Sequence, residues 1–120
     1  MEIINNLFGN ICELLPQREY ALLTGEFRSS DHGAFMGEEE WDPDRVRAEA
    51  KFVHFSDYPF PKPWEESTIK EQEEAVPKCG IDKEGREDCR ARDIWVELYR
   101  DFKMRRKVCL FFLVIWCLGD

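Results

Sequence analysis

The sequence lacks the residue patterns of several common catalytic sites. Gly25, Gly33 and Gly37 are scattered, so no glycine-rich phosphate loop is present. The Gly-x-Ser-x-Gly turn that presents a nucleophilic serine is also missing, and no serine has a neighbouring histidine with an orienting carboxylate. These absences argue against a hydrolase and against a phosphate site built on a glycine-rich loop.

Positive charge and zinc-binding cysteine pairs are scarce as well. The net charge is -8 and the isoelectric point is near 4.8, with a basic run only at residues 103–107. Because a nucleic-acid backbone requires a basic face, we expect no nucleic-acid partner. The five cysteines include no Cys-x-x-Cys pair, which argues against structural zinc. Cys79 and Cys89 flank a polar loop, and both a disulfide in a secretory lumen and two free thiols in the cytosol fit this arrangement.

Long apolar runs are limited to one, at residues 108–118, behind the basic residues 103–107. A helix that crosses a bilayer takes about 20 residues, so this run is too short to span one. Three interpretations remain open: a buried strand or helix extension, a non-native tail from an altered gene model, and a contact with a membrane surface or another protein. We read no signal peptide in this sequence and expect it to encode no secretory address. We therefore divide the chain into residues 1–107 and an apolar tail, residues 108–120.

The residues that are present predict a folded α/β chain. The hydrophobic content is 43% and the aromatic content is 13%, which excludes wholesale disorder, and 120 residues suffice for a core. Apolar spacing, prolines and turn residues predict the following elements. These are helices at residues 2–7, 43–50, 68–75 and 88–106, strands at 11–15, 20–24 and 51–55, a mobile loop at 25–40 and a loop at 77–87.

The helix at residues 88–106 has the clearest pattern. Its apolar residues recur at intervals of three and four and so form one face: Ala91, Ile94, Trp95, Leu98, Tyr99 and Phe102. This face is expected to pack in the core, and the alternative is a surface for another protein.

The two histidines differ in context. His32 lies in a polar loop beside Asp31 and is expected to be exposed to solvent, with a ligand or acceptor contact as the alternative. His54 ends an apolar run, and a loop stiffened by prolines then presents Lys62. An imidazole that binds a divalent cation and an ammonium that binds phosphate could together neutralise a leaving diphosphate.

The stretch from His54 to Lys62-Pro63-Trp64 resembles the His-x-x-Gly-x-x-Lys-Pro-Trp signature of family-8 glycosyltransferases, the glycogenin-like enzymes, and especially their fungal N-acetylglucosaminyltransferase-like members. Residues 1–8, 15–28 and 88–102 resemble other parts of the same group. The resemblance implies His54 as a ligand of Mn²⁺ and Lys62 at the diphosphate of a nucleotide-sugar donor, such as a UDP-sugar. Ser56 and Asp57 are expected as further cofactor-binding residues, although the Asp57 carboxylate would repel phosphate unless it turns away or helps to hold the cation. Asp57 stands where the family has glycine, and the loop is two residues longer.

In that family two further metal ligands come from an Asp-x-Asp motif after a strand. The only such pattern here is Asp42-Pro43-Asp44, which reads instead as the start of a helix with Asp42 as its N-cap. The resemblance therefore implies the C-terminal portion of a Rossmann-like, metal-dependent glycosyltransferase domain at residues 1–107, inactive alone and located in the Golgi lumen or the cytoplasm. The alternative is a non-catalytic acidic interaction protein that uses its amphipathic helix and apolar tail.

Overall fold

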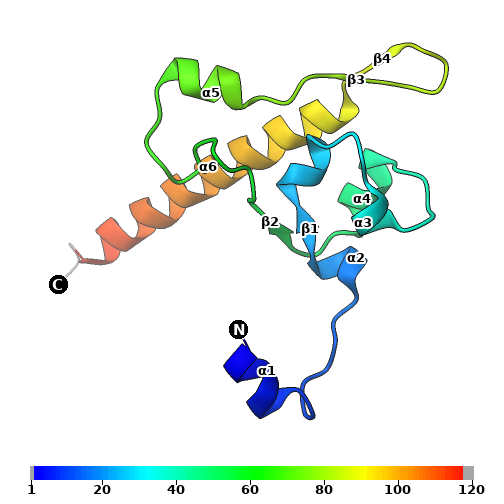
Figure 1. The fold of residues 1–120 in the computed structure, drawn as a ribbon. Helices are drawn as coiled ribbons and strands as arrows, with labels where there is room; N and C mark the ends of the chain where they lie inside the picture. The colour runs from blue at the N-terminus through cyan, green and yellow to red at the C-terminus, as the bar shows by residue number, and fades with distance from the viewer. Residues whose placement is uncertain (1, 118–120) are drawn as a thin grey trace.

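The computed structural model describes the backbone of residues 2–117 and the side chains of residue 3 and residues 6–106. Figure 1 shows short helices and strands gathered beside one long C-terminal helix. In chain order the elements are α1 (Glu2–Phe8), α2 (Gln17–Tyr20), β1 (Leu22–Leu23), the 3-10 helix η1 (Thr24–Phe27), α3 (Gly33–Met36), α4 (Pro43–Glu49), β2 (Val53–His54), α5 (Ile69–Ala75), β3 (Gly80–Ile81), β4 (Glu87–Asp88) and α6 (Arg90–Cys117).

The strands form two small sheets. Strand β1 pairs with β2 in parallel, with Leu22 opposite Val53 and Leu23 opposite His54. Strand β3 pairs with β4 as an antiparallel hairpin. The structure is therefore a mixture of helices and small sheets, and the Rossmann-like arrangement of a larger domain stays a prediction.

The core lies between α6 and the segments around β1 and α4. Leu22 and Val46 are fully buried, and Trp95 and Tyr99 of α6 are 3% and 7% exposed. Helix α6 lies against α4 and η1. Its apolar face is thus part of the core, as the spacing predicted, which removes one of the two surfaces that an interaction protein would have used.

The mobile loop predicted at residues 25–40 is wrong. This segment contains η1 and α3, and it buries Phe27, Phe35 and Met36. The guanidinium of Arg18 lies 5.5 Å from the centre of the Phe35 ring and donates to the sulfur of Met36 at 3.1 Å. Isolated apolar residues between glycines and charges show no periodicity, so only their tertiary contacts reveal that they belong to the core.

Of the two strands predicted near the N-terminus, the one at residues 11–15 is wrong, and the one at residues 20–24 is shorter than predicted. Residues 11–15 form no strand, and Ile11 and Leu14 are 79% and 93% exposed. Pro16 does not separate two strands but stands at the N-cap position of α2, and only Leu22–Leu23 is extended. A strand needs a partner with free backbone groups, and β2 offers only two residues, both paired with β1.

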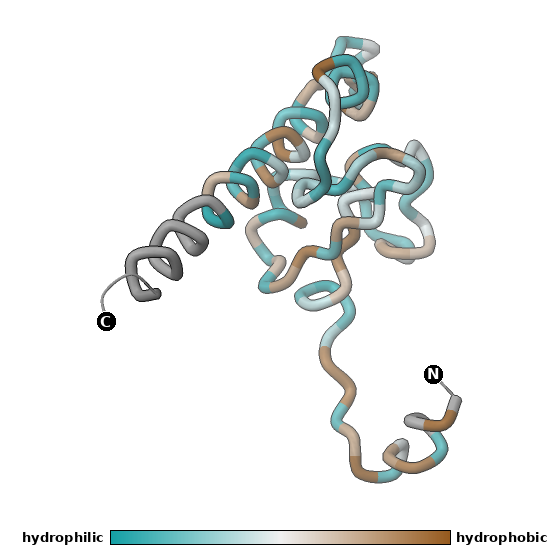
Figure 2. The backbone as a smooth tube through the Cα atoms, turned by 90° about the vertical axis from the view of Figure 1, so that its left-hand side faces the viewer, coloured by the Kyte–Doolittle hydropathy of each residue, from teal (hydrophilic) through white to brown (hydrophobic). Residues whose placement is uncertain are grey.

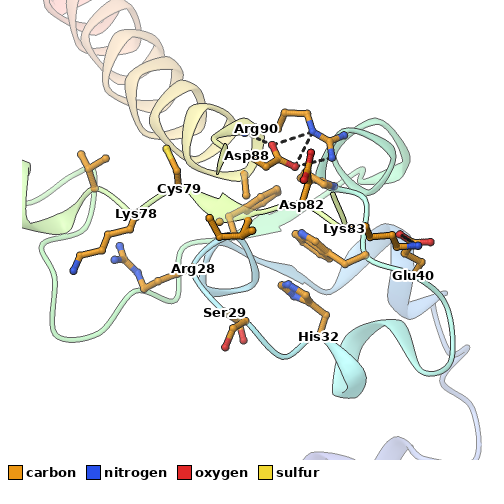
Figure 3. A pocket seen from close by; sticks show the side chains of 18 of the residues that line it. Arg28, Ser29, His32, Glu40, Lys78, Cys79, Asp82, Lys83, Asp88 and Arg90 are labelled. Carbon is orange, nitrogen blue, oxygen red and sulfur yellow. Dashed lines mark hydrogen bonds and ion pairs between the residues drawn. The ribbon is translucent and has the colours of Figure 1, made fainter. Parts of the chain in front are cut away.

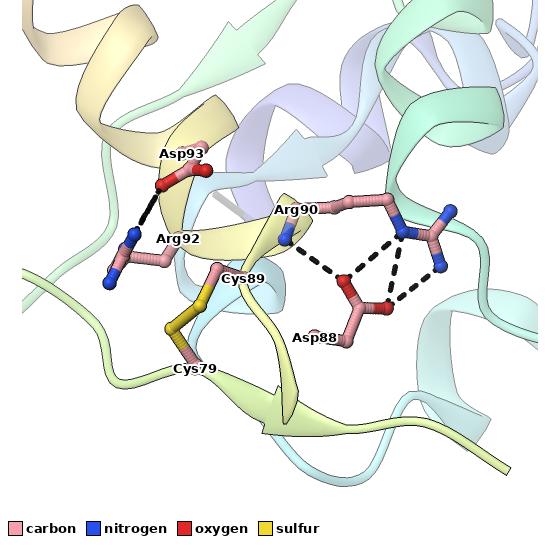
Figure 4. The surroundings of a disulfide bond; sticks show 6 residues. All are labelled: Cys79, Asp88, Cys89, Arg90, Arg92 and Asp93. Carbon is pink, nitrogen blue, oxygen red and sulfur yellow. Dashed lines mark hydrogen bonds and ion pairs between the residues drawn. A yellow bond between two sulfur atoms is a disulfide. The ribbon is translucent and has the colours of Figure 1, made fainter. Parts of the chain in front are cut away.

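The loop predicted at residues 77–87 is instead a hairpin closed by a Cys79–Cys89 disulfide (Figure 4). The carboxylate of Asp82 accepts hydrogen bonds from the backbone N–H groups of Glu84 and Arg86, and Gly85 has a φ of 80°. A positive φ of this kind favours glycine. Of the two thiol states left open by the sequence, the structure has the disulfide, so these sulfurs are not free to bind zinc.

The molecule is extended for its length. Its radius of gyration is 18.0 Å, whereas a compact domain of this size has about 14 Å. Helix α1 and residues 9–16 run away from the core, and α6 projects past it (Figures 1 and 2). Many side chains of this N-terminal segment are apolar and exposed, including Ile3, Leu7, Ile11, Leu14 and Leu15.

Helix α6 continues through Cys117, so the backbone of the apolar tail is helical up to that residue. The side chains of the tail lie outside the described residues, and its burial or contact with a membrane or protein stays a prediction. Within the part of the chain whose placement is described, no helix has the length and apolarity needed to cross a bilayer.

Helix α4 begins as the sequence predicted. The carboxylate of Asp42 accepts from the N–H groups of Asp44 and Arg45 at 3.0 and 3.2 Å, and Pro43 occupies the first turn. We expect Asp42→Ala to lower the free energy of unfolding by about 1 kcal/mol, because two N–H groups lose their acceptor. Asp42→Asn keeps a capping oxygen and should change it little. Urea denaturation followed by circular dichroism measures both, and equal losses in the two variants would contradict the cap.

Candidate functional site

The parallel pair β1 and β2 places several polar residues at one edge. Both strands end here, at Leu23 and His54, and their continuations, Thr24 and Gly25 on one side and Ser56 on the other, lie together. In α/β proteins, ligands commonly bind outside the carboxyl ends of parallel strands. This edge is therefore the candidate functional site.

Asp57 joins this edge to α6. Its side chain is fully buried, and one oxygen accepts from the Tyr99 hydroxyl at 2.9 Å and from the Thr24 hydroxyl. The other oxygen accepts from Arg28 Nε at 3.2 Å. Arg28 also donates to the carbonyl of Ala75, and its guanidinium lies 4.4 Å from the centre of the Phe60 ring. Residues from three parts of the chain thus meet at one carboxylate: Thr24 and Arg28 at η1, Asp57 after β2 and Tyr99 on α6.

These contacts control the protonation of Asp57 and Tyr99. Burial by itself raises the pKa of Asp57, but the hydrogen bonds from Thr24, Tyr99 and Arg28 together outweigh burial and hold this pKa below its ordinary value. Burial and the Asp57 carboxylate both raise the pKa of Tyr99. Asp57 is therefore ionised inside the fold with both oxygens engaged, which gives it a structural role; its predicted contact with the donor stays a prediction.

Ser56 is also engaged within the site. Its hydroxyl accepts from the backbone N–H of Gly25 at 3.1 Å, and its own N–H donates to the Thr24 hydroxyl at 3.0 Å. A Cβ at Gly25 would lie 3.0 Å from the Ser56 hydroxyl, so a side chain there would crowd it. These bonds hold the two strand ends together, and the predicted contact of Ser56 with a cofactor is not tested by them.

His54 and Lys62 are the predicted site residues whose side chains form no hydrogen bond or ion pair with other described residues. His54 is exposed on β2, while its carbonyl accepts from the Thr24 hydroxyl at 3.4 Å. Lys62 is partly exposed. Its N–H donates to the Glu65 carboxylate at 2.7 Å, and its carbonyl accepts from the Glu65 N–H at 3.0 Å. The structure therefore leaves the imidazole and the ammonium available to a ligand.

The loop that carries Lys62 is anchored on α6 by Trp64. The Trp64 ring lies 5.9 Å from the Phe55 ring and 5.5 Å from the Phe102 ring, and its carbonyl accepts from Arg106. Pro63 is buried, and the peptide bond between Tyr58 and Pro59 is cis. The Lys-Pro-Trp motif thus contains two residues that hold the loop in place and one, Lys62, whose side chain forms no hydrogen bond or ion pair with other described residues.

Sequence reasoning missed a cavity of about 830 Å³ between η1, the segment before α4 and the β3–β4 hairpin (Figure 3). Its walls include Arg28, His32, Trp41, Lys78 and Asp88. None of the four predicted site residues, His54, Ser56, Asp57 and Lys62, lines it. His32 is not the solvent-exposed residue expected: its side chain is only 15% exposed, and its ring stacks on Trp41 with 3.9 Å between centres. The signal in the sequence was the pair Cys79 and Cys89, which closes the hairpin that forms one wall.

The chain is similar to several fungal proteins named Glucose N-acetyltransferase 1. It is 50% identical over 113 residues to the one from Aspergillus fumigatus and 45% identical over 112 residues to the one from Gibberella zeae. The one from Saccharomyces cerevisiae is 31% identical over 125 residues. These matches cover 91%, 91% and 89% of this chain. The glycosyltransferase-like relationship that the sequence resemblance implied is thereby supported, whereas the family-8 assignment stays a prediction.

The chain spans less than a third of these relatives, namely 29%, 24% and 24% of their lengths. No protein-family model matches the chain, and no solved structure matches it. The relationship therefore concerns a segment of the relatives, and their activity comes to this chain only as a proposal.

Proposed function

We propose that this chain forms the diphosphate side of a glycosyltransferase that takes its sugar, a hexose or an N-acetylhexosamine, from a nucleotide-sugar donor. The observation that carries the proposal is the exposed His54 at the carboxyl end of a parallel strand, followed by an anchored loop that presents Lys62. Similarity to proteins named Glucose N-acetyltransferase 1 supports the same reaction class. A Rossmann-like arrangement of the whole domain is part of the proposal.

The residues fit a divalent cation in one respect and not in another. His54 offers a free imidazole, a good ligand for Mn²⁺. Asp57 does not offer a second ligand from the same loop, because its carboxylate is buried and bound to Thr24, Tyr99 and Arg28. Asp42 and Asp44 do not resemble a metal-binding Asp-x-Asp, since Asp42 caps α4 and both face Arg90. This chain therefore supplies one position of the metal site, and we expect no sugar transfer by the chain alone.

The roles of the cation and of Lys62 follow from their charges. When bound, the cation offsets negative charge that develops on the leaving diphosphate. Lys62 adds a compact positive charge on a flexible stem, suited to a phosphate oxygen without demanding fixed geometry. Trp64 and Pro63 restrict where this ammonium can reach, so the anchored loop lowers the entropy that ligand binding must remove.

Titration of uridine diphosphate with Mn²⁺ tests the proposal. We expect binding, measured by isothermal titration calorimetry, to weaken about tenfold in Lys62→Ala and in His54→Ala, because each removes one contact to the metal-bound diphosphate. In the absence of Mn²⁺, His54→Ala should change binding little, while Lys62→Ala should still weaken it.

A matched control is Lys70→Ala. Lys70 is exposed on α5 and forms only a long ion pair with Glu74 at 3.8 Å. This variant should bind like the original chain. Equal binding of uridine diphosphate by all three variants would contradict the assignment of the site. Binding that does not change with Mn²⁺ in the original chain or in any variant would contradict it as well.

A further inference from the structure

The cavity of about 830 Å³ is within the range of small-molecule binding sites. Figure 3 shows its labelled side chains coming from the loop after η1, from the segment before α4, from the hairpin and the residues just before it, and from the start of α6. The disulfide between Cys79 and Cys89 fixes the hairpin to α6, and Lys83 Nζ lies 2.6 Å from Glu40 Oε1 across to the segment before α4. The disulfide therefore closes the hairpin wall covalently, and the ion pair joins this wall to the segment before α4.

The charges of the cavity favour a neutral ligand. Its lining contains four Lys or Arg residues and five Asp or Glu residues, so the two signs nearly cancel. Most of these charges are already paired, as in Arg90 with Asp88 at 2.8 Å and Arg28 with Asp57 at 3.2 Å. An anion would meet the unpaired carboxylate oxygens, and a cation would meet Arg28 and Lys78. A ligand with many hydroxyl groups can instead donate to the carboxylates and accept from the cations.

The remaining lining is aromatic and rigid. Phe27, Trp41 and Phe60 line the cavity. The Trp41 ring stacks on the His32 ring and makes a T-shaped contact with Phe27, with 5.7 Å between the ring centres. His32 is fixed in turn by Glu26, whose carboxylate lies 3.2 Å from Nδ1. Fixed aromatic surfaces suit the apolar C–H face of a pyranose ring, while the polar rim suits its hydroxyl edge.

From these observations we infer that this cavity binds a neutral oligosaccharide through Trp41, and that this sugar is the acceptor of the transfer. The inference depends on the proposed function only where it calls this sugar the acceptor; binding of the sugar itself does not depend on it. Donor and acceptor then use different residues: His54 and Lys62 at the strand ends for the donor, and the space between η1 and the hairpin for the acceptor. Lys78, which forms no ion pair with other described residues, is available to an acceptor hydroxyl.

Saturation-transfer difference NMR on the whole chain tests the inference, with chitotriose and mannotriose as neutral probes and citrate as a charged comparator. We expect saturation transfer to at least one trisaccharide and none to citrate. Trp41→Ala should reduce the signal about tenfold, since buried aromatic anchors dominate small binding sites. Because Trp41→Ala also removes core contacts, Ser30→Trp provides a second variant: Ser30 is exposed, lines the cavity and can be enlarged to fill it.

Phe52→Ala is the matched aromatic control, because Phe52 is 56% exposed and lines no part of this cavity. It should leave the trisaccharide signal unchanged. Absence of transfer to both trisaccharides, transfer to citrate instead, or an undiminished signal in a folded Ser30→Trp variant would overturn the inference. Trisaccharide binding without Mn²⁺-dependent uridine diphosphate binding would contradict the donor site alone, and the reverse result would contradict the acceptor cavity alone.

Discussion

Replacing Asp57 with alanine is expected to lower the free energy of unfolding by about 3–5 kcal/mol. The variant removes the carboxylate that Arg28, Thr24 and Tyr99 share, and leaves a partly buried guanidinium and two hydroxyl groups without their acceptor. Unsatisfied buried groups cost more than the bonds themselves contribute. Urea denaturation followed by far-ultraviolet circular dichroism measures the loss.

Two controls accompany this variant. Asp57→Asn keeps an acceptor for Tyr99 but loses the charge facing Arg28, so we expect a smaller loss. Asp101→Ala removes an exposed carboxylate paired with Arg105 at 2.7 Å, and should cost less than about 1 kcal/mol. If Asp57→Ala costs no more than Asp101→Ala, the network does not stabilise the fold.

The same residue gives a pH dependence with a definite sign. The pKa of Asp57 is lower in the folded chain than its ordinary value of 3.8, so the unfolded chain binds the proton first. The stabilisation is present above pH 3.8 and is lost as the pH falls below it toward the folded pKa. Denaturation midpoints should therefore fall more steeply below about pH 4 for the original chain than for Asp57→Asn.

The second large effect concerns the disulfide. The double variant Cys79→Ser with Cys89→Ser should lower the free energy of unfolding by about 2–3 kcal/mol, because a closed loop of this length restricts the unfolded chain. The separation of the two cysteines is 10 residues. Cys12→Ser is the control, since Cys12 is a free, exposed thiol. Thermal melts with and without dithiothreitol measure both effects, and a melt of the original chain that ignores the reductant would contradict the prediction.

Much of the helical structure was predictable from local signals. Asp42 followed by Pro43 predicted the start of α4, and the three- and four-residue spacing around Trp95 predicted the apolar face of α6; both predictions are confirmed. The alternation in residues 52–55 also holds, since His54 and Phe52 are exposed while Val53 is partly buried. These features depend on neighbouring residues, which a single sequence displays directly.

The failures have a common physical origin. Phe35 and Met36 are buried because Arg18 and other distant residues lie over them, and residues 11–15 stay unpaired because β2 is too short to accept another strand. Neither fact is encoded in the local pattern. Prediction of the β3–β4 hairpin depended on whether Cys79 and Cys89 form a disulfide, and their spacing in the sequence allowed both the disulfide and two free thiols.

The candidate site shows the same difference between features encoded locally and features that depend on distant residues. His54 and Lys62 were identified by residue type and order, and their free side chains are compatible with the roles assigned to them. Asp57 was predicted at the cofactor because of its place in the motif, yet its surroundings depend on Thr24, Arg28 and Tyr99, which are remote in sequence. The cavity beside Trp41 is lined by several separate segments, so no single stretch of sequence could predict it.

The hydrogen bonds that join residues distant in sequence to the Asp57 carboxylate also imply an order of folding during biosynthesis. Thr24 and Arg28 leave the ribosome before Asp57, whereas Tyr99 follows Asp57 by 42 positions. Until Tyr99 has emerged, the nascent chain cannot complete the hydrogen bonds to the Asp57 carboxylate, and the segments already translated should remain loosely associated. Maturation of this region is therefore expected to await the translation of Tyr99 and the rest of α6.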